Sequence, residues 1–302
     1  MSAGADSLKS IFFALGANFL IAVTKTAGAV LTGSSSMLAE AIHSYADCAN
    51  QVLLIWGLRE ADHVPDPEHP LGYGKAIYFW SFIVALMLFS MGGLFSIYEG
   101  VHKLRAPEPI ANVWVAIAIL VFGVVAESVS LWGCLREVNK ERGSQSLWRW
   151  FRSSRQSELL VVFAEDVAAL GGLATALVFI GLALATGNPA WDAAGSICIG
   201  VLLVLVAFMV GIEVKALLIG QSVEAAVLRR MRMYLEARPE TETIYNLITQ
   251  QLGGDVMVAV KARMKPVASA EALITTINTI EKDFRAAFPQ VHFLFFEPDL
   301  KD

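Results

Sequence analysis

The sequence predicts a membrane protein with two parts, an all-α bundle of six transmembrane helices followed by a small cytoplasmic α+β domain. Of the 302 residues, 56% are apolar and only 17% are charged, and the mean hydropathy is +0.57. These values are too apolar for an ordinary soluble domain. After Gly220 the apolar runs become shorter and charged residues become frequent. We therefore expect a transmembrane domain over residues 1–220 and a cytoplasmic domain over residues 221–302.

Six stretches are long and apolar enough to cross a bilayer, which takes about 20 residues of helix. They cover residues 8–31, 36–58, 76–102, 112–135, 157–185 and 191–219. The first stretch follows a short polar start without an obvious cleavage site, so we interpret it as a retained span and not as a signal peptide.

The residues after Gly220 show helical and strand patterns in turn. Alternation on both sides of Gly253-Gly254 predicts a β-hairpin, and Ser269 is placed to cap an amphipathic helix. The predicted elements are a helix over 222–237, strands over 244–253 and 255–264, a helix over 269–288 and a strand over 290–298. This order of elements is typical of a ferredoxin-like domain.

Lysine and arginine predict the orientation, because cytoplasmic loops carry an excess of both. The segment 136–155 holds six of them and three more follow the last span, whereas the loops on the other side are nearly bare. We therefore expect an integral, multi-pass protein of the cell (inner) membrane with both termini and the final domain in the cytoplasm or its topological equivalent.

Composition also excludes several classes of protein. The net charge of -5 argues against a nucleic-acid partner. The three cysteines, Cys48, Cys134 and Cys198, stand far apart in apolar runs. They predict neither a disulfide framework nor a CxxC metal site.

Ionisable residues within the second span indicate a binding site, because charges in a bilayer are costly and usually face a bundle interior. His43 and Asp47 are four residues apart and therefore share a helix face. A histidine and a carboxylate at this spacing can hold a divalent cation; a hydrogen-bonded pair without metal is the alternative. Glu40 and Asn50 extend the same stripe.

The fifth span carries two adjacent acids, Glu165 and Asp166. On the helix they flank the face that contains Val162, so a cation opposite Val162 could be reached by Asp166 directly and by the longer Glu165 side chain. Two neighbouring carboxylates in a membrane repel each other unless a cation or a proton neutralises them. A bound cation is therefore the favoured interpretation.

Three other polar residues within the spans are weaker candidates for a transport role. These are Asn18, Lys25 and Glu127. Lys25 could neutralise an acid such as Glu40 or Asp47, or extend its amine to the membrane surface.

The loop between the second and third spans contains Asp66, His69 and Tyr73. Asp66 and His69 are candidates for a second metal site. A polar turn shaped by the nearby prolines and by residues 72–74 is the alternative, and on the residues alone we favour the turn.

These features together resemble the cation diffusion facilitator family of divalent-metal/proton antiporters. The resemblance rests on TGSSSMLAEAIHSYAD (residues 32–47), HPLGYGK (residues 69–75), the six spans and the final domain. In that family the transport site joins an (H/D)xxxD pair on the second helix to an (H/D/N)xxxD pair on the fifth. The resemblance implies that His43 and Asp47 are the ligands of the second span and Asp166 is the aspartate of the fifth.

The sequence departs from the family pattern at Val162, which stands four residues before Asp166 where a ligand is expected. Glu165 is the natural substitute, and the Glu-Asp pair looks like the branch that contains the mitochondrial-type zinc transporters. One imidazole with three carboxylates is a harder ligand set than two of each. Manganese, iron or cobalt is therefore the alternative to zinc.

Two departures concern the cytoplasmic parts. Family members with a loop metal site offer two histidines there, whereas this chain has His69 and Tyr73, so we expect a weak site at Asp66 and His69 or none. The final domain has a single histidine, His292, and Glu297 at its acidic strand end. We expect this domain to serve dimerisation.

The resemblance implies efflux of a divalent metal, with zinc as the expected ion, by proton-coupled antiport with alternating access around a midplane site. The implied partners are metal ions, protons, the lipid bilayer and a second copy of the chain, with no cofactor besides the transported ion. A membrane metal sensor or scaffold that binds without transporting is the alternative, motivated by Val162. An enzyme is not expected, because neither HExxH nor GxSxG occurs.

Overall fold

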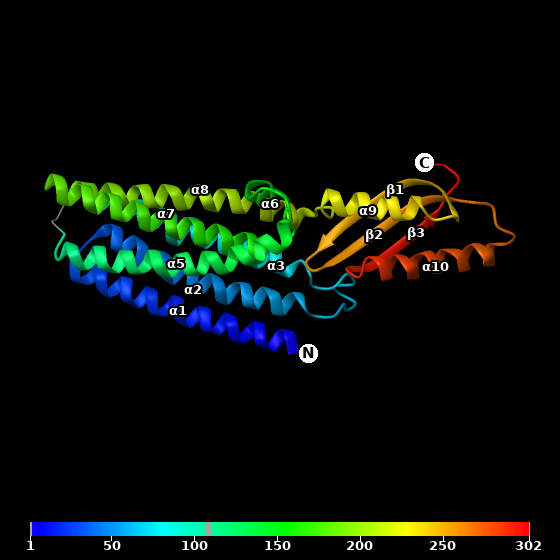
Figure 1. The fold of residues 1–302 in the computed structure, drawn as a ribbon, viewed down its shortest axis with the longest axis horizontal. Coiled ribbons are helices and arrows are strands. Elements are labelled where there is room, and N and C mark those ends of the chain that lie inside the picture. The colour runs from blue at the N-terminus through cyan, green and yellow to red at the C-terminus, as the bar shows by residue number, and fades with distance from the viewer. Residues whose placement is uncertain (1, 107–109, 302) are drawn as a thin grey trace.

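The computed structural model describes residues 2–106 and 110–301, with side chains from Leu15 onward apart from residue 17. Long helices lie side by side along one half of the molecule, and a small sheet domain lies beyond their ends (Figure 1). The helical part consists, in chain order, of α1 (Ser2–Thr32), α2 (Ser35–Ala61), α3 (Ala76–Met87), the π-helix η1 (Leu88–Leu94), α4 (Phe95–Arg105), α5 (Val113–Arg142), α6 (Leu147–Ser153), α7 (Ser157–Thr186) and α8 (Ala190–Ile219).

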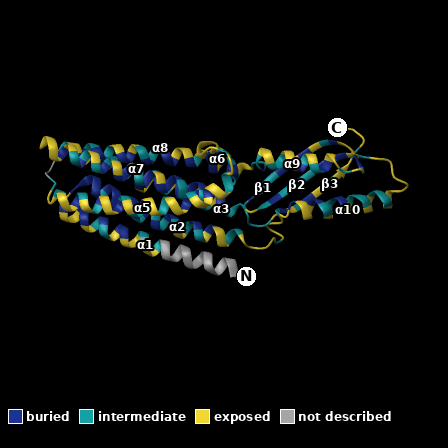
Figure 2. Cartoon of the chain, in the orientation of Figure 1, coloured by how far each residue is buried: buried dark blue, intermediate teal, exposed yellow. Residues whose placement is uncertain are grey.

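The helices of the bundle match the six predicted spans. Within the described residues, four stretches are long and apolar enough to cross a membrane, namely Ala76–Arg105, Val113–Arg142, Ser157–Thr186 and Ala190–Ile219, and Asn18–Thr32 is a shorter apolar stretch. α2 packs between α1 and α3, and its buried polar residues lower its hydropathy. Buried and exposed residues alternate along each helix (Figure 2). The predicted membrane bundle is confirmed.

Two local features of the bundle were not predicted. The third span is continuous from Ala76 to Arg105 but contains the π-helical turn η1. The short helix α6 interrupts the basic segment after α5; its cap Ser146 accepts a hydrogen bond from the Arg149 backbone N–H, and Trp150 is buried beneath it.

The third and last spans pack very closely through small residues. A Cβ atom on Gly200 of α8 would lie 2.6 Å from the carbonyl oxygen of Gly93 in η1. One turn away, the Ser196 hydroxyl donates a 2.8 Å hydrogen bond to the Ser96 carbonyl of α4. The backbones can approach this far only because both glycines lack side chains.

The start of α2 is bonded to the start of α8. Ser34 caps α2 by accepting a hydrogen bond from the Met37 N–H. The buried Asp192 carboxylate accepts from the Ser34 hydroxyl at 2.7 Å, and from the Ser35 N–H at 2.8 Å. The Ser36 hydroxyl in turn donates to the Asp192 carbonyl at 2.9 Å. The TGSSS run is therefore the anchor that joins one end of α2 to α8.

The sheet domain has the order of elements that the sequence predicts. It contains α9 (Ala225–Glu236), β1 (Thr241–Leu252), β2 (Asp255–Met264), α10 (Ala270–Ala287) and β3 (Val291–Pro298). The sheet order is β1-β2-β3, with β1 and β2 an antiparallel hairpin and β2 and β3 parallel across α10. Ser269 caps α10 by accepting from the Ala272 N–H, as predicted.

Both helices of this domain cover one face of its sheet. Met231 of α9 and Phe284 of α10 are fully buried in the same apolar core, and the rings of Tyr234 and Phe284 are in contact. The other face of the sheet carries a row in register, Ile248, Ala259 and Phe295. Ile248 is 53% exposed and Phe295 is 56% exposed, so this row is an open apolar surface.

The bundle and the sheet domain meet at two glycines. Gly253, in the hairpin turn, has φ +66, and a Cβ atom on it would lie 2.4 Å from the Gly74 carbonyl oxygen. Its N–H donates a 2.9 Å hydrogen bond to the Tyr78 hydroxyl of α3. The loop before α3 and the β1–β2 turn are thus in direct backbone contact.

Candidate metal site

The α2 stripe places buried, unpartnered donor atoms inside the bundle. His43 is fully buried and the Asp47 side chain is 14% exposed. His43 Nδ1 lies 3.5 Å from Asp47 Oδ1, yet neither this oxygen nor either ring nitrogen forms a hydrogen bond within the described residues. Buried polar atoms without partners are rare and costly, so these atoms are available to bind a ligand.

The α7 acids face the same region from the other side. The Asn50 amide of α2 donates a hydrogen bond to Glu165 Oε1. The Ser130 hydroxyl of α5 donates to Asp166 Oδ1 at 3.1 Å. Asp166 Oδ2 is buried and has no partner among the described residues. The sequence placed Asn50 on the α2 stripe, but its bond to Glu165 across two helices was not predicted.

Val162 supplies no donor atom. Its side chain is partly buried and packs against the apolar core of the bundle. The acid that the structure connects to α2 is Glu165, through Asn50.

A second buried group of charges lies beside the α2 pair. Lys25 of α1 is 1% exposed. Its amine donates hydrogen bonds to Ser44 Oγ at 2.8 Å and to Glu40 Oε2 at 3.2 Å. The same amine lies 3.9 Å from Glu127 Oε1 of α5. Of the partners expected for Lys25, the structure selects Glu40. The other oxygen, Glu40 Oε1, abuts α7 at Gly172, where a Cβ atom would lie 2.3 Å from it.

The π-helical turn η1 borders His43. A Cβ atom on Gly92 would lie 3.9 Å from His43 Nδ1, which is ordinary van der Waals contact, so the imidazole is a direct neighbour of η1. π-Helical turns occur often at functional sites. The Gly92-Gly93 pair within an apolar span was the sequence signal for this turn. Hydropathy alone does not reveal it, because both glycines fit an ordinary apolar span.

The donor atoms form two pairs and not one closed cluster. In the described ranges, no three His, Cys, Asp or Glu side chains lie close enough together to hold one metal ion. The α2 pair is His43 and Asp47, the α7 pair is Glu165 and Asp166, and Asn50 links them.

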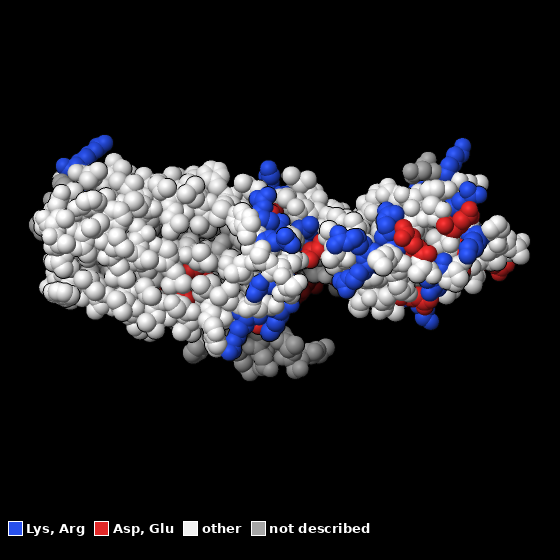
Figure 3. All heavy atoms as spheres, turned by 45° about the horizontal axis from the view of Figure 1, so that its top comes forward, with Lys and Arg blue, Asp and Glu red and all other residues white. Residues whose placement is uncertain are grey.

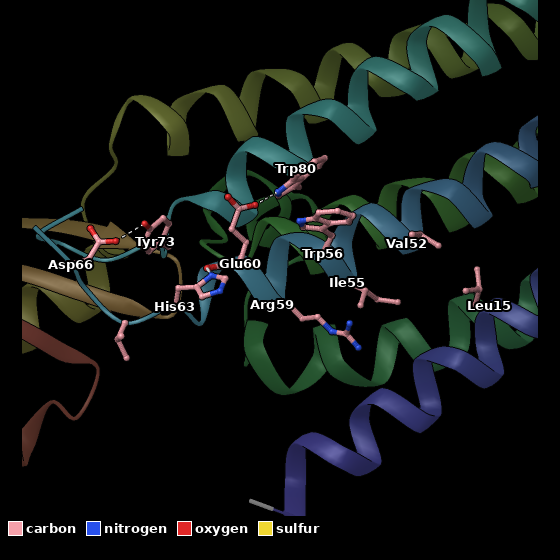
Figure 4. A pocket seen from close by; sticks show the side chains of 11 residues that line it. Leu15, Val52, Ile55, Trp56, Arg59, Glu60, His63, Asp66, Tyr73 and Trp80 are labelled. Atoms are coloured by element: carbon pink, nitrogen blue, oxygen red, sulfur yellow. Dashed lines mark hydrogen bonds between the residues drawn. The ribbon is translucent and has the colours of Figure 1, made fainter. Parts of the chain in front are cut away.

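The candidate loop residues form a polar turn. Asp66 Oδ1 accepts from the backbone N–H groups of Glu68 and His69, and Oδ2 accepts from the Tyr73 hydroxyl at 2.7 Å (Figure 4). The Tyr73 hydrogen bond is the main cause that lowers the pKa of Asp66 below its ordinary value. His69 Nδ1 lies 3.4 Å from Asp66 Oδ1, and the His69 side chain is 48% exposed. Both Asp66 oxygens are therefore already engaged in the turn.

A cavity of about 1000 Å³ opens beside the end of α2 that faces the sheet domain (Figure 4). Val52, Ile55 and Trp56 form part of its apolar wall, and Glu60 at its polar end accepts a hydrogen bond from the Trp80 indole. None of the four donor residues on α2 and α7 lines this cavity, so it is separate from the candidate site.

The single histidine of the sheet domain, His292, lies on its surface. His292 Nδ1 is 3.0 Å from Asp255 Oδ1, and both side chains are about half exposed. One histidine and one carboxylate supply fewer donors than a structural metal site uses.

Comparison with known proteins finds relatives over most of the chain. A family model described as the cation efflux transmembrane domain matches residues 11–219. The chain is 34% identical over 256 residues to a Xenopus laevis protein named proton-coupled zinc antiporter SLC30A9, mitochondrial, covering 84% of this chain and 45% of the relative.

Two further relatives cover similar shares. The human protein of that name is 33% identical over 277 residues, 91% of this chain and 48% of the relative. Metal tolerance protein C4 of Arabidopsis thaliana is 30% identical over 253 residues, 82% of this chain and 54% of the relative. The chain thus spans about half the length of these curated relatives.

Proposed function

The chain belongs to the cation efflux family, and from this premise we propose that it is a transporter that expels divalent metal ions, zinc foremost, in exchange for protons. The observation that carries the proposal is a set of buried atoms that have no hydrogen-bond partner in the described part of the chain. They are both His43 ring nitrogens, Asp47 Oδ1 and Asp166 Oδ2. Imidazole nitrogens and carboxylate oxygens are the donors that zinc binds.

His43 and Asp47 bind the ion from α2, and Asp166 and Glu165 bind it from α7. Glu165 uses the oxygen that its hydrogen bond from Asn50 leaves free. Because the two pairs do not surround one point, binding draws α2 and α7 toward each other. The ion is held by one imidazole and three carboxylates, which also suits manganese, iron or cobalt.

Proton exchange follows from the chemistry of the donors. Imidazole and carboxylates must lose their protons to bind a metal, so loading from the cytoplasmic side releases protons. When the site opens to the other side, protons from that compartment displace the metal. The helices rock around a fixed midplane site between the two states.

The proposal includes the orientation of the protein in the membrane. Lys and Arg gather at the end of the bundle next to the sheet domain, whereas the long face of the bundle is nearly free of charge (Figure 3). This distribution supports a cytoplasmic sheet domain, residues 221–302, attached to a transmembrane domain, residues 1–220, with both termini in the cytoplasm.

A homodimer is the proposed assembly. The open apolar row of Ile248, Ala259 and Phe295 on the sheet is the surface that supports it, because exposed apolar patches mark sites of association.

The loop site remains the weaker proposal. His69 and Asp66 bind a cytoplasmic ion weakly if the Asp66 oxygens exchange their turn hydrogen bonds for the metal. Zinc titration of the purified protein tests this: His69→Ala should remove one weak binding event and leave transport intact.

The decisive experiment is metal flux into proteoliposomes that hold the full chain, with an imposed pH gradient and a panel of zinc, manganese, iron and cobalt. We expect zinc flux that stops when the gradient is dissipated. His43→Ala, Asp47→Asn and Asp166→Asn should each reduce flux by roughly 100-fold, since even residues that only orient a ligand cost about 10–100-fold. Glu99→Gln, which removes an acid at the end of another span, is the matched control.

Normal flux in all three variants would place the site elsewhere. Zinc binding without flux at any gradient would identify a sensor or scaffold in place of a transporter. Glu165→Gln tests the fourth ligand separately: wild-type binding and flux in this variant would remove Glu165 from the site.

A further inference from the structure

Lys25 is a fully buried cation that ties three helices together next to the proposed site. Its amine reaches Ser44 and Glu40 of α2 and lies 3.9 Å from Glu127 of α5. A buried ammonium needs such partners, and in return it fixes where they lie. Its position therefore determines where the Glu40 carboxylate lies.

Glu40 is itself a latent metal ligand. It precedes His43 by three residues, so the two side chains are neighbours on one face of α2. Glu40 Oε1 is fully buried and has no hydrogen-bond partner within the described residues. That oxygen is held against Gly172 of α7, and only the missing side chain of the glycine makes room for it.

We propose that Lys25 is a positioning residue that withholds Glu40 from the transported ion, so that α2 contributes His43 and Asp47 alone. The ammonium binds Glu40 Oε2, and its positive charge opposes a second cation at that carboxylate. This inference rests on the proposed transport function. Removing Lys25 would release a fourth carboxylate, and the ion would then be bound more tightly and released more slowly.

The test compares Lys25→Met with wild type in the same proteoliposomes, measuring kcat and KM for zinc and for manganese. We expect kcat for zinc to fall by about tenfold while KM falls as well, because added ground-state binding slows release. The preference should also shift toward manganese, since a fourth carboxylate makes the site harder. Val23→Met, on the exposed side of the same helix, is the matched control.

The double variant Lys25→Met/Glu40→Gln decides the cause. It removes both charges of the Lys25–Glu40 pair, so that Glu127 is the one acid of this group that loses its cation, and it should fold more readily than the single variant. If Lys25 acts by withholding Glu40, the double variant recovers the kcat and the metal preference of wild type. The inference would be overturned if the double variant is expressed at the normal level and elutes normally from a size-exclusion column, but keeps the low kcat of the single variant.

The single variant Glu40→Gln tests separately whether Glu40 binds the ion in the wild-type protein. Zinc binding and flux close to wild type are expected, because Glu40 is not a ligand while Lys25 holds it. Loss of zinc binding in Glu40→Gln would show that Glu40 already coordinates the ion and would overturn the inference. Unchanged kinetics in Lys25→Met would do the same, whereas absence of flux in wild type would instead contradict the transport function itself.

Discussion

At the residue scale, the hydrogen bond from Asn50 to Glu165 is the direct side-chain link between the two proposed halves of the site. Asn50 is fully buried and its own carbonyl oxygen has no partner among the described residues. A group that orients a ligand in this way fixes which oxygen is presented to the metal. We therefore propose that Asn50 positions Glu165 in the proposed site without being a ligand itself.

Asn50→Ala should raise the apparent KM for zinc by about tenfold, since loss of a residue that orients a ligand typically costs 10–100-fold in affinity. Zinc flux at graded concentrations measures this. Asn139→Ala, an exposed asparagine on α5, is the control. An unchanged KM in Asn50→Ala would mean that Glu165 is positioned without it.

Sequence patterns could predict which site residues share one helix face, but not which side chains of different helices are in contact. His43 and Asp47 were placed together because four residues along one helix fix their relation. The contacts of Asn50 with Glu165, and of Asp166 with Ser130, join different helices. They depend on how each helix is rotated in the bundle, and periodicity within one helix does not contain that information.

At the scale of elements, the pairing of the third and last spans depends on glycine. Gly200→Ala would bring a Cβ atom within 2.6 Å of the Gly93 carbonyl oxygen, and overpacking of this kind typically costs about 1–3 kcal/mol. Gly211→Ala on the same helix meets nothing within 4 Å. It should be neutral or stabilising by up to about 1 kcal/mol, the helix preference of alanine over glycine.

Thermal unfolding of the two variants in detergent, followed by circular dichroism, measures the difference. Gly200→Ala should melt at a lower temperature than wild type and Gly211→Ala should not. Equal midpoints for both would mean that the backbones of η1 and α8 can separate at little cost.

Four of the spans were predictable because each is a long apolar run in the described residues, whereas α2 carries buried polar residues and Asn18–Thr32 is a shorter apolar stretch. The π-helical turn η1 was not predictable, since a turn with i→i+5 hydrogen bonds has the same hydropathy as one with i→i+4. The short helix α6 was missed because its buried Trp150 lies in a segment dominated by charge.

At the scale of the whole molecule, the bundle and the sheet domain are in contact at Gly74 and Gly253. Gly253→Ala combines strain at φ +66 with a Cβ atom 2.4 Å from the Gly74 carbonyl oxygen. We expect it to loosen the joint, with faster cleavage between residues 220 and 225 in limited proteolysis and reduced zinc flux. Gly254→Ala, which meets nothing within 4 Å, is the neighbouring control. Equal cleavage of both variants would contradict a joint that depends on this contact.

The order of elements in both parts was predictable, but the contact between them was not. Gly253-Gly254 was identified as a hairpin turn. That its backbone also touches Gly74 and the Tyr78 hydroxyl depends on the placement of one part on the other, which local turn chemistry does not specify.

The bond between Asp192 and the start of α2 gives that helix a fixed end. If α2 tilts during transport, the helix rotates about its fixed end at Ser35. At 1.5 Å per residue, His43 lies about 12 Å from this point and Ala61 about 39 Å from it. A tilt of about 10° therefore displaces His43 by roughly 2 Å and Ala61 by roughly 7 Å. A movement just large enough to remake the coordination of one ion becomes a wide swing at the end of α2 nearest the sheet domain.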